Sequence, residues 1–141
     1  MKTRNSIKVL ITLFLLGGLS SKAQLALNNN GSLVLKIDSG LVVHSDGDFA
    51  NMNTSSLVFE SLGEPHLEFD GDFINGTSAT LTAGLGLLDL TGSASQDLDF
   101  GGDDLYNLEI NNAAGGVFTR AATVSKEVQF TTGDFTTTDA N

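Results

Sequence analysis

The chain has 141 residues, with 16 glycines, one proline and no cysteine or tryptophan. This length suits one domain, and the lack of cysteine excludes a disulfide framework and a thiolate metal site. The net charge is −10 over the whole chain, but from Gln24 onward three basic and 17 acidic residues leave 3 − 17 = −14. A surface this acidic repels phosphate backbones, so nucleic acid is not an expected partner.

The segment 1–23 has the layout of a secretory signal peptide. A basic stretch at 1–8 precedes an apolar stretch at 9–19, and Ser21 and Ala23 place small residues before a cleavage site ahead of Gln24. The apolar stretch has 11 residues, whereas a transmembrane helix needs about 20. We therefore expect the protein to be secreted or held on the outer cell surface, and to meet a membrane only during export.

Short apolar runs alternate with turn residues through the mature chain, residues 24–141. Ten runs are expected to be strands: 33–37, 41–43, 56–60, 66–70, 79–83, 85–90, 98–100, 105–110, 117–119 and 128–130. Apolar residues recur at every second position in several of them, as in Leu67 and Phe69, which is the pattern of a half-buried strand. Turn signals such as Asn75-Gly76 separate the runs. The mature chain is therefore expected to be all-β.

A second pattern repeats over a longer distance. Gly-Asp pairs recur after apolar residues, with their glycines at positions 47, 71, 102 and 133, so the intervals in residue number are 24, 31 and 31. Self-similarity at such a period is typical of a stacked solenoid, in which each turn buries its apolar face against its neighbours. Residues 24–141 are expected to form a right-handed parallel β-helix. An antiparallel β-sandwich is the alternative that also fits short strands.

The last residues do not form a recognisable cap. Residues 136–141 (TTTDAN) follow a Gly-Asp-Phe unit in mid-pattern, whereas a solenoid needs a polar terminal cap. We therefore expect an N-terminal piece of a longer protein, with a complete short chain as the alternative. A bare strand edge at this end invites self-association.

Five short stretches of the sequence are typical of one kind of bacterial repeat. They lie at 71–75 (GDFIN), 92–98 (GSASQDL), 106–112 (YNLEINN), 116–117 (GV) and 132–135 (TGDF). Together they resemble the repeat region of adhesin-like β-helical surface proteins, which bacteria export by type IX secretion. The resemblance covers roughly residues 30–138 and implies a β-helical architecture and a cell-surface location. Such proteins usually end in a C-terminal sorting domain, which is not recognisable here, and the family offers no functional residues to carry over.

Acidic turns supply the candidate metal ligands. Six carboxylates on tight glycine turns offer the hard oxygen ligands that Ca²⁺ prefers: Asp46, Asp48, Asp70, Asp72, Asp103 and Asp104. The EF-hand spacing and the glycine-rich nonapeptide of calcium-binding β-rolls are absent, so a solvated turn is the competing interpretation. His44 and His66 have no second ligand at metal spacing in the sequence, and we interpret them as surface or strand-edge residues.

The sequence shows no catalytic constellation. It has no Gly-x-Ser-x-Gly motif for a nucleophile, and only Lys36, Arg120 and Lys126 follow residue 22 as bases to neutralise an acidic polysaccharide. We expect no enzyme activity. The expected function is an exported structural or adhesive segment that contacts a cell-surface glycan or protein. Two alternatives stay open, a Ca²⁺- or glycan-binding β module and the non-catalytic leader of a larger secreted enzyme.

Overall fold

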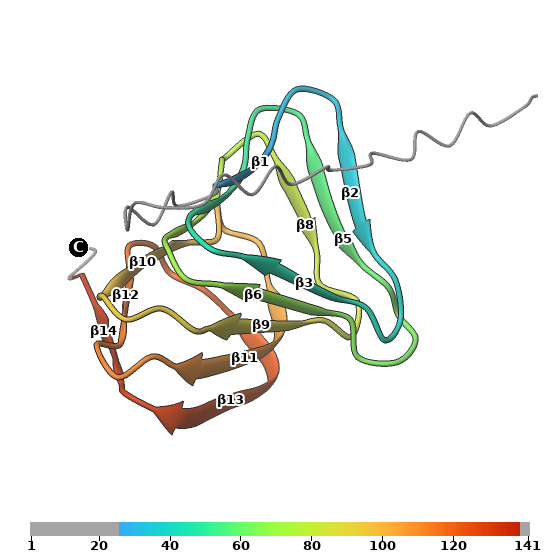
Figure 1. Cartoon of the computed structure of the whole chain (residues 1–141). Coiled ribbons are helices and arrows are strands. Elements are labelled where there is room, and N and C mark those ends of the chain that lie inside the picture. Colours follow the sequence, from blue (N-terminus) through green and yellow to red (C-terminus); the bar gives the residue numbers. More distant parts are fainter. Residues whose placement is uncertain (1–25, 139–141) are drawn as a thin grey trace, which may run out of the picture.

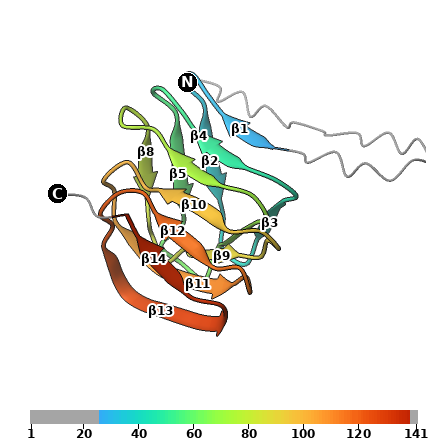
Figure 2. The same cartoon turned by 90° about the vertical axis from the view of Figure 1, so that its left-hand side faces the viewer.

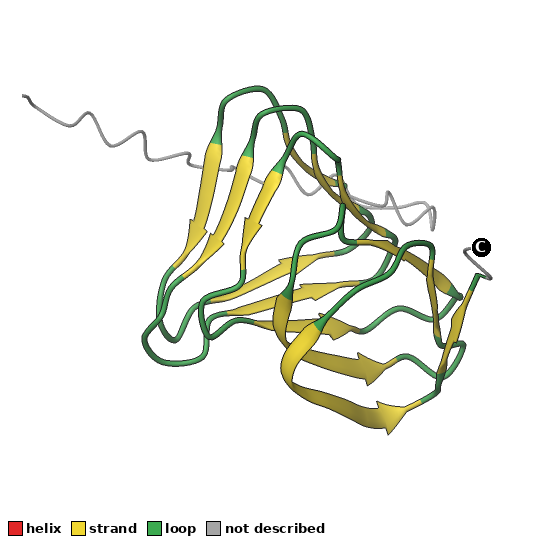
Figure 3. Ribbon diagram, turned by 180° about the vertical axis from the view of Figure 1, so that it is seen from behind, coloured by secondary structure: helices red, strands yellow, loops and turns green. Residues whose placement is uncertain are grey.

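The computed structural model describes residues 26–138, and the expected signal peptide at 1–23 lies outside this range. Every regular element in the described part of the chain is a β-strand (Figure 3). No described segment forms a helix long and apolar enough to cross a membrane. The strands are β1 (Leu27–Asn29), β2 (Val34–Ile37), β3 (Val42–Ser45), β4 (Phe49–Asn51), β5 (Ser56–Phe59), β6 (His66–Phe69), β7 (Phe73–Asn75), β8 (Thr80–Thr82), β9 (Leu87–Leu90), β10 (Gln96–Asp99), β11 (Leu105–Asn111), β12 (Gly116–Phe118), β13 (Val124–Thr132) and β14 (Phe135–Thr137).

These strands form three sheets that wrap around one core (Figure 1). One sheet has the order β1-β4-β7-β10-β12-β14, the second β13-β11-β9-β6-β3 and the third β2-β5-β8. Figure 2 faces the first sheet, whose strands lie one above the next. The strand pairs of all three sheets are parallel, because the chain completes a turn before it returns to the same sheet. The expected parallel β-solenoid is confirmed, with about five turns, and the antiparallel sandwich is wrong.

In the six-stranded sheet, successive turns pair at a sequence separation that becomes shorter after β10. Phe73 of β7 pairs with Phe49 of β4, and Leu98 of β10 pairs with Phe73. Gly116 of β12 then pairs with Gln96 of β10, which is a clearly smaller separation in the sequence. Among the described residues, the segments that connect β10 to β11 and β12 to β13 add no strand to the three-stranded sheet. The later turns therefore contain fewer residues.

The longer interval expected from the later Gly-Asp pairs is therefore wrong. Because Leu98 pairs with Phe73, the counterpart of Asp72 is Asp97, and the Asp97 N–H donates to Asp72 Oδ1 at 2.8 Å. The pair Gly102-Asp103 lies instead in the loop between β10 and β11. The interval from Gly47 to Gly71 thus joins equivalent positions, whereas the interval from Gly71 to Gly102 does not.

A row of phenylalanines runs through the core along the stacking direction. The ring centroids of Phe49 and Phe73 are 5.3 Å apart, and those of Phe73 and Phe100 are 5.2 Å apart. The row continues from Phe100 to Phe118 and then to Phe135, with centroids 5.7 and 4.9 Å apart. Aromatic pairs at these distances add about 0.5–1.5 kcal/mol each beyond the burial of their area. The phenylalanines of successive turns thus repeat the same packing contact along the core.

An asparagine ladder runs parallel to this row. Asn29 Nδ2 donates to Asn51 Oδ1 at 2.8 Å, and Asn51 Nδ2 donates to Asn75 Oδ1 at 2.6 Å. All three residues are buried at corresponding corners at the ends of β1, β4 and β7. A buried amide is tolerated only when its donors and acceptors are satisfied. Here the amides satisfy one another from turn to turn, which fixes the register of the turns.

The last described turn leaves inward-pointing apolar side chains open to solvent. Val128 and Phe130 of β13 pair with the buried Leu108 and Ile110 of β11, and therefore point in the same direction. Nevertheless Val128 is 38% exposed and Phe130 is 51% exposed, and Phe135 of β14 is 38% exposed. Val128, Phe130 and Phe135 form what we call the open end of the solenoid.

Candidate functional site

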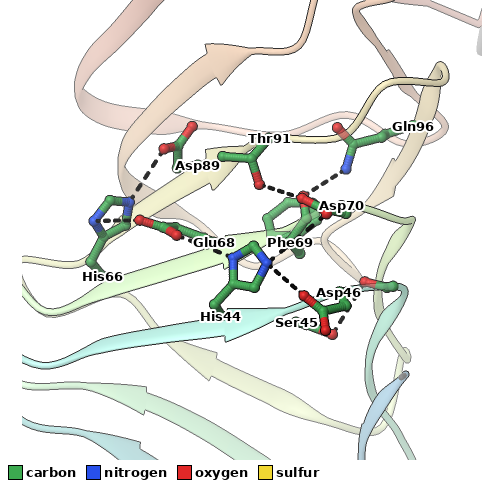
Figure 4. Close-up of polar contacts among 11 residues, drawn as sticks. His44, Ser45, Asp46, His66, Glu68, Phe69, Asp70, Asp89, Thr91 and Gln96 are labelled. Carbon is green, nitrogen blue, oxygen red and sulfur yellow. Dashed lines mark hydrogen bonds and ion pairs between the residues drawn. The ribbon is translucent and has the colours of Figure 1, made fainter. Parts of the chain in front are cut away.

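Outward-facing side chains of the five-stranded sheet bring histidines and carboxylates together. Residues that alternate with the core positions of β3, β6 and β9 point away from the core, and the parallel register aligns them from turn to turn. His44 of β3 therefore stands beside Glu68 of β6, which stands beside Asp89 of β9. We call the whole set the histidine–carboxylate face (Figure 4): His44, Asp46, His66, Glu68, Asp70 and Asp89.

One group on this face surrounds the His44 ring. His44 Nε2 lies 3.1 Å from Asp46 Oδ1 and 3.9 Å from Asp70 Oδ2. On its other side, His44 Nδ1 lies 3.1 Å from Glu68 Oε2. Both ring nitrogens thus have a carboxylate at hydrogen-bond distance. The His44 and Asp46 side chains are well exposed, so water screens this network and each pair contributes little to stability.

The second group surrounds the His66 ring and lies deeper. His66 Nε2 is 3.6 Å from Asp89 Oδ2, and His66 Nδ1 is 3.8 Å from Glu68 Oε1. Asp89 is only 5% exposed, which is rare for an acidic residue unless it is paired. Neither His66 Nε2 nor Asp89 Oδ1 has a hydrogen-bond partner. This group therefore buries charged and polar atoms without satisfying them.

The electrostatics of the face favour positive charge at His66. The neighbouring Asp89 carboxylate is the main cause that raises the His66 pKa above its ordinary value, and the Glu68 and Glu109 carboxylates act in the same direction. Partial burial of the ring opposes them by disfavouring its charged form. The attraction of the carboxylates outweighs the desolvation, so these neighbours favour the protonated form of the His66 ring.

A hollow of about 210 Å³ lies on the same five-stranded sheet, and its lining does not include His66, Glu68 or Asp89. It lies over Leu87, the register partner of His66, and over Asn107 in the following turn. The remaining lining residues are mostly acidic or polar: Glu64, Leu108, Glu109, Glu127 and Gln129. Asn107 Oδ1 is buried and has no hydrogen-bond partner. Since a water molecule takes about 30 Å³ of liquid volume, the hollow has room for several waters or for a polar group of a ligand.

Three of the six predicted Ca²⁺ candidates support the stacking of the turns. Asp48 Oδ1 accepts the N–H of Asp72 at 3.0 Å, and Asp72 in turn accepts the N–H of Asp97. Asp103 Oδ2 accepts the N–H of Leu81 at 2.7 Å. These carboxylates bond to backbone in another turn, whereas the expectation for a solvated turn was a bond to their own backbone. This use of acidic corners depends on the register between turns, which the sequence alone does not specify.

The other three candidates lie at the surface. Asp46 and Asp70 approach each other beside His44, as part of the first group of the face. Asp104 is exposed in the loop before β11. Among residues 26–138, no three of the six carboxylates place ligand atoms within 4.8 Å of one another. The structure therefore distributes these residues along the solenoid and gathers only one pair of them with a histidine.

His44 and His66 lie on the outer side of the sheet, as expected for surface residues, but they have carboxylate neighbours that the sequence spacing did not indicate. Most of their carboxylate neighbours come from adjacent turns, so they are distant in the sequence. Alignment of 42–49 (VVHSDGDF) with 66–73 (HLEFDGDF) would have placed His44 opposite Glu68, as the observed register does. No comparable signal was available for Asp89, because its turn lacks the Asp-Gly-Asp corner.

Comparisons with models of protein families, with curated proteins and with solved structures find no match to this chain.

Proposed function

We propose that the chain is an exported structural segment of a cell-surface protein, which acts as a stiff scaffold and offers its sides for adhesion. The observation that carries this proposal is the stacking of like side chains in register along the solenoid. Asn29, Asn51 and Asn75 form one such row, and the core phenylalanines form another. A chain built this way extends in one direction by adding turns, which is what a stalk or fibre requires.

The acidic charge supports a role outside the cell. The signal-peptide pattern of residues 1–23 precedes a mature sequence with a formal charge of −14. High net charge keeps an exported protein soluble and limits association with like-charged surfaces. The resemblance to adhesin-like repeat regions leads to the same proposal from a different line of reasoning.

Adhesion suits the geometry of the outer surface. Parallel strands lie about 4.8 Å apart, so each outward row presents side chains at a regular spacing. A repeated spacing lets many weak contacts with a glycan or protein surface act together, which raises avidity without a deep pocket. The partner is accordingly proposed to be a cell-surface glycan or protein that itself has repeated groups.

An attachment assay tests this function. Producing cells that lack the gene are compared with the parent strain and with cells complemented by the full chain, by counting cells that resist washing from a host-derived or abiotic surface. We expect deletion to reduce attachment by a clear margin and complementation to restore it. The matched control is complementation by the chain without residues 2–23, which retains the mature sequence but not the export signal. Equal attachment of all strains would contradict the proposal.

A further inference from the structure

Three unsatisfied polar atoms lie on neighbouring strands on the outer side of the five-stranded sheet. They are His66 Nε2, Asp89 Oδ1 and Asn107 Oδ1, and each is buried without a hydrogen-bond partner. An orphaned buried polar group is costly, and native proteins usually satisfy it with a water or an ion. Their positions on the neighbouring strands β6, β9 and β11 indicate that something besides the protein satisfies these atoms.

The spacing of the groups fits a shared ion better than direct hydrogen bonds. The distances of 3.6 Å from His66 Nε2 to Asp89 and 3.8 Å from His66 Nδ1 to Glu68 exceed those of hydrogen bonds. Ligands about 2.0–2.1 Å from a tetrahedral zinc ion lie about 3.3 Å from one another. A single ion binds only one of the two ring nitrogens, and with Nε2 as the ligand its 3.6 Å separation from Asp89 Oδ2 is close to this value. One ligand atom from each of His66, Glu68 and Asp89 lies within 4.8 Å of the other two.

We propose that His66, Glu68 and Asp89 bind a divalent transition-metal ion of the zinc type. An imidazole nitrogen with two carboxylates is a donor set for Zn²⁺, Co²⁺ or Ni²⁺, whereas Ca²⁺ prefers oxygen ligands alone. Water or a donor from a partner would complete the coordination at the fourth position. The neighbouring His44 group is more exposed, and both of its ring nitrogens already have close carboxylate partners.

Such an ion would join two turns of the solenoid. His66 and Glu68 belong to β6 and Asp89 belongs to β9, and these strands are neighbours in the sheet. The ion would therefore stabilise the stacking of the turns, and native-state binding would raise the melting temperature. This inference does not depend on the adhesive role, because the site would exist in the folded chain whatever its biological partner.

Calorimetric titration of the purified full chain with Zn²⁺, after treatment with a chelator, tests the site. We expect one ion per chain, a higher melting temperature with Zn²⁺ and at least about tenfold weaker binding of Ca²⁺. His66→Gln and Asp89→Asn should each weaken Zn²⁺ binding at least about tenfold. The matched control is Asp104→Asn, which changes an exposed carboxylate outside the face and should bind Zn²⁺ within about twofold of the parent chain. His44→Gln removes a contact of Glu68 and should weaken binding less than His66→Gln does.

A measurement on the unaltered chain keeps the test decisive if a variant fails to fold. In nitrogen-15 NMR, Zn²⁺ should shift the ring nitrogens of His66 strongly and those of His44 weakly. Absence of saturable Zn²⁺ binding would overturn the proposal. Loss of binding in His44→Gln with retention in His66→Gln, or a larger shift at His44, would equally overturn the assignment of the ligands.

Discussion

Asn51 shows how one side chain can determine the register of a whole turn. Its amide accepts from Asn29 and donates to Asn75, so both ends of the group are used inside the core. Asn51 Nδ2 also donates to the carbonyl of Thr80, at 3.0 Å. A shift of one residue between turns would break all of these bonds at once. At the scale of single residues, the stacking is therefore specified by buried polar groups as much as by apolar area.

Replacement of Asn51 should destabilise the chain strongly. Asn51→Ala leaves the Asn29 amide and the Asn75 carbonyl oxygen short of a partner, and each orphaned group costs about 1–3 kcal/mol. We expect a loss of about 2–4 kcal/mol in the free energy of unfolding, measured by urea denaturation. Asn111→Ala is the matched control, because Asn111 is exposed on β11. A loss below about 0.5 kcal/mol in Asn51→Ala would show that the ladder does not stabilise the fold.

Lys36 and Glu60 form a surface ion pair that changes the pKa of Glu60. The hydrogen bond from Lys36 is the main cause that lowers the Glu60 pKa, and a hydrogen bond from the Ser39 N–H adds to it. A lowered folded-state pKa means that any stabilisation from Glu60 is present above its unfolded pKa and is lost as the pH falls through its folded pKa. Lys36→Met should therefore raise the Glu60 pKa toward its ordinary value. The measurement is an NMR titration of the Glu60 carboxyl carbon over the acid range in both chains. An unchanged titration midpoint in Lys36→Met would contradict the prediction.

At the scale of elements, the phenylalanine row connects one turn with the next. Phe73 of β7 lies between Phe49 and Phe100, and it also contacts the Phe69 ring at a centroid distance of 5.4 Å. Phe73 is fully buried. Its ring therefore contributes to the packing of the same three turns that the hydrogen bonds of β4, β7 and β10 join.

Phe73→Ala should therefore be among the more damaging core substitutions. The cavity left by a buried phenylalanine costs about 3–5 kcal/mol, measured as the change in unfolding free energy in urea. Ile74→Ala, at the next position on the same strand, is the control, because Ile74 faces outward and is 38% exposed. Equal losses for the two variants would mean that the inward and outward faces of β7 have been assigned wrongly.

The sequence predicted the longer strands but not the three-residue strands β1, β4, β7 and β14, and it did not predict contacts between turns. Alternation identified Leu67 and Phe69 as inward residues of one strand, and both are buried in β6. Turn signals located most strand ends, because Gly and Asn have local conformational preferences. The repeat interval failed after β7, because the chain omits the third sheet from its later turns. The approach of His66 and Asp89 was not predictable, because it depends on a register that joins residues from different turns.

At the scale of the whole molecule, the open end is the most exposed apolar feature of the last described turn. Val128 and Phe130 occupy core rows, and no further described turn covers them. The outer edge of β13 also lacks a neighbouring strand among residues 26–138, because β13 is the last strand of its sheet. Uncovered edges of this type favour association with another strand. We propose that any self-association through this end uses Val128, Phe130 and the free edge of β13.

Phe130→Lys should reduce concentration-dependent association of the purified chain. A charge at an apolar contact is costly to bury, so we expect the dissociation constant from sedimentation equilibrium to rise at least about tenfold. Leu62→Lys is the matched control, since Leu62 is exposed in the loop after β5 and lies outside the open end. A parent chain that stays monomeric at all concentrations, or equal effects of both variants, would contradict association through the open end.

The central claim is that this chain works outside the cell as a processed scaffold. Its most direct test is the location and intact mass of the gene product in producing cells, measured by surface biotin labelling of Lys36 and Lys126 on intact cells followed by mass spectrometry. The account predicts labelled protein whose mature sequence begins at Gln24, in the outer-membrane or culture fraction. Unlabelled protein that retains residues 1–23 inside the cell would contradict the account.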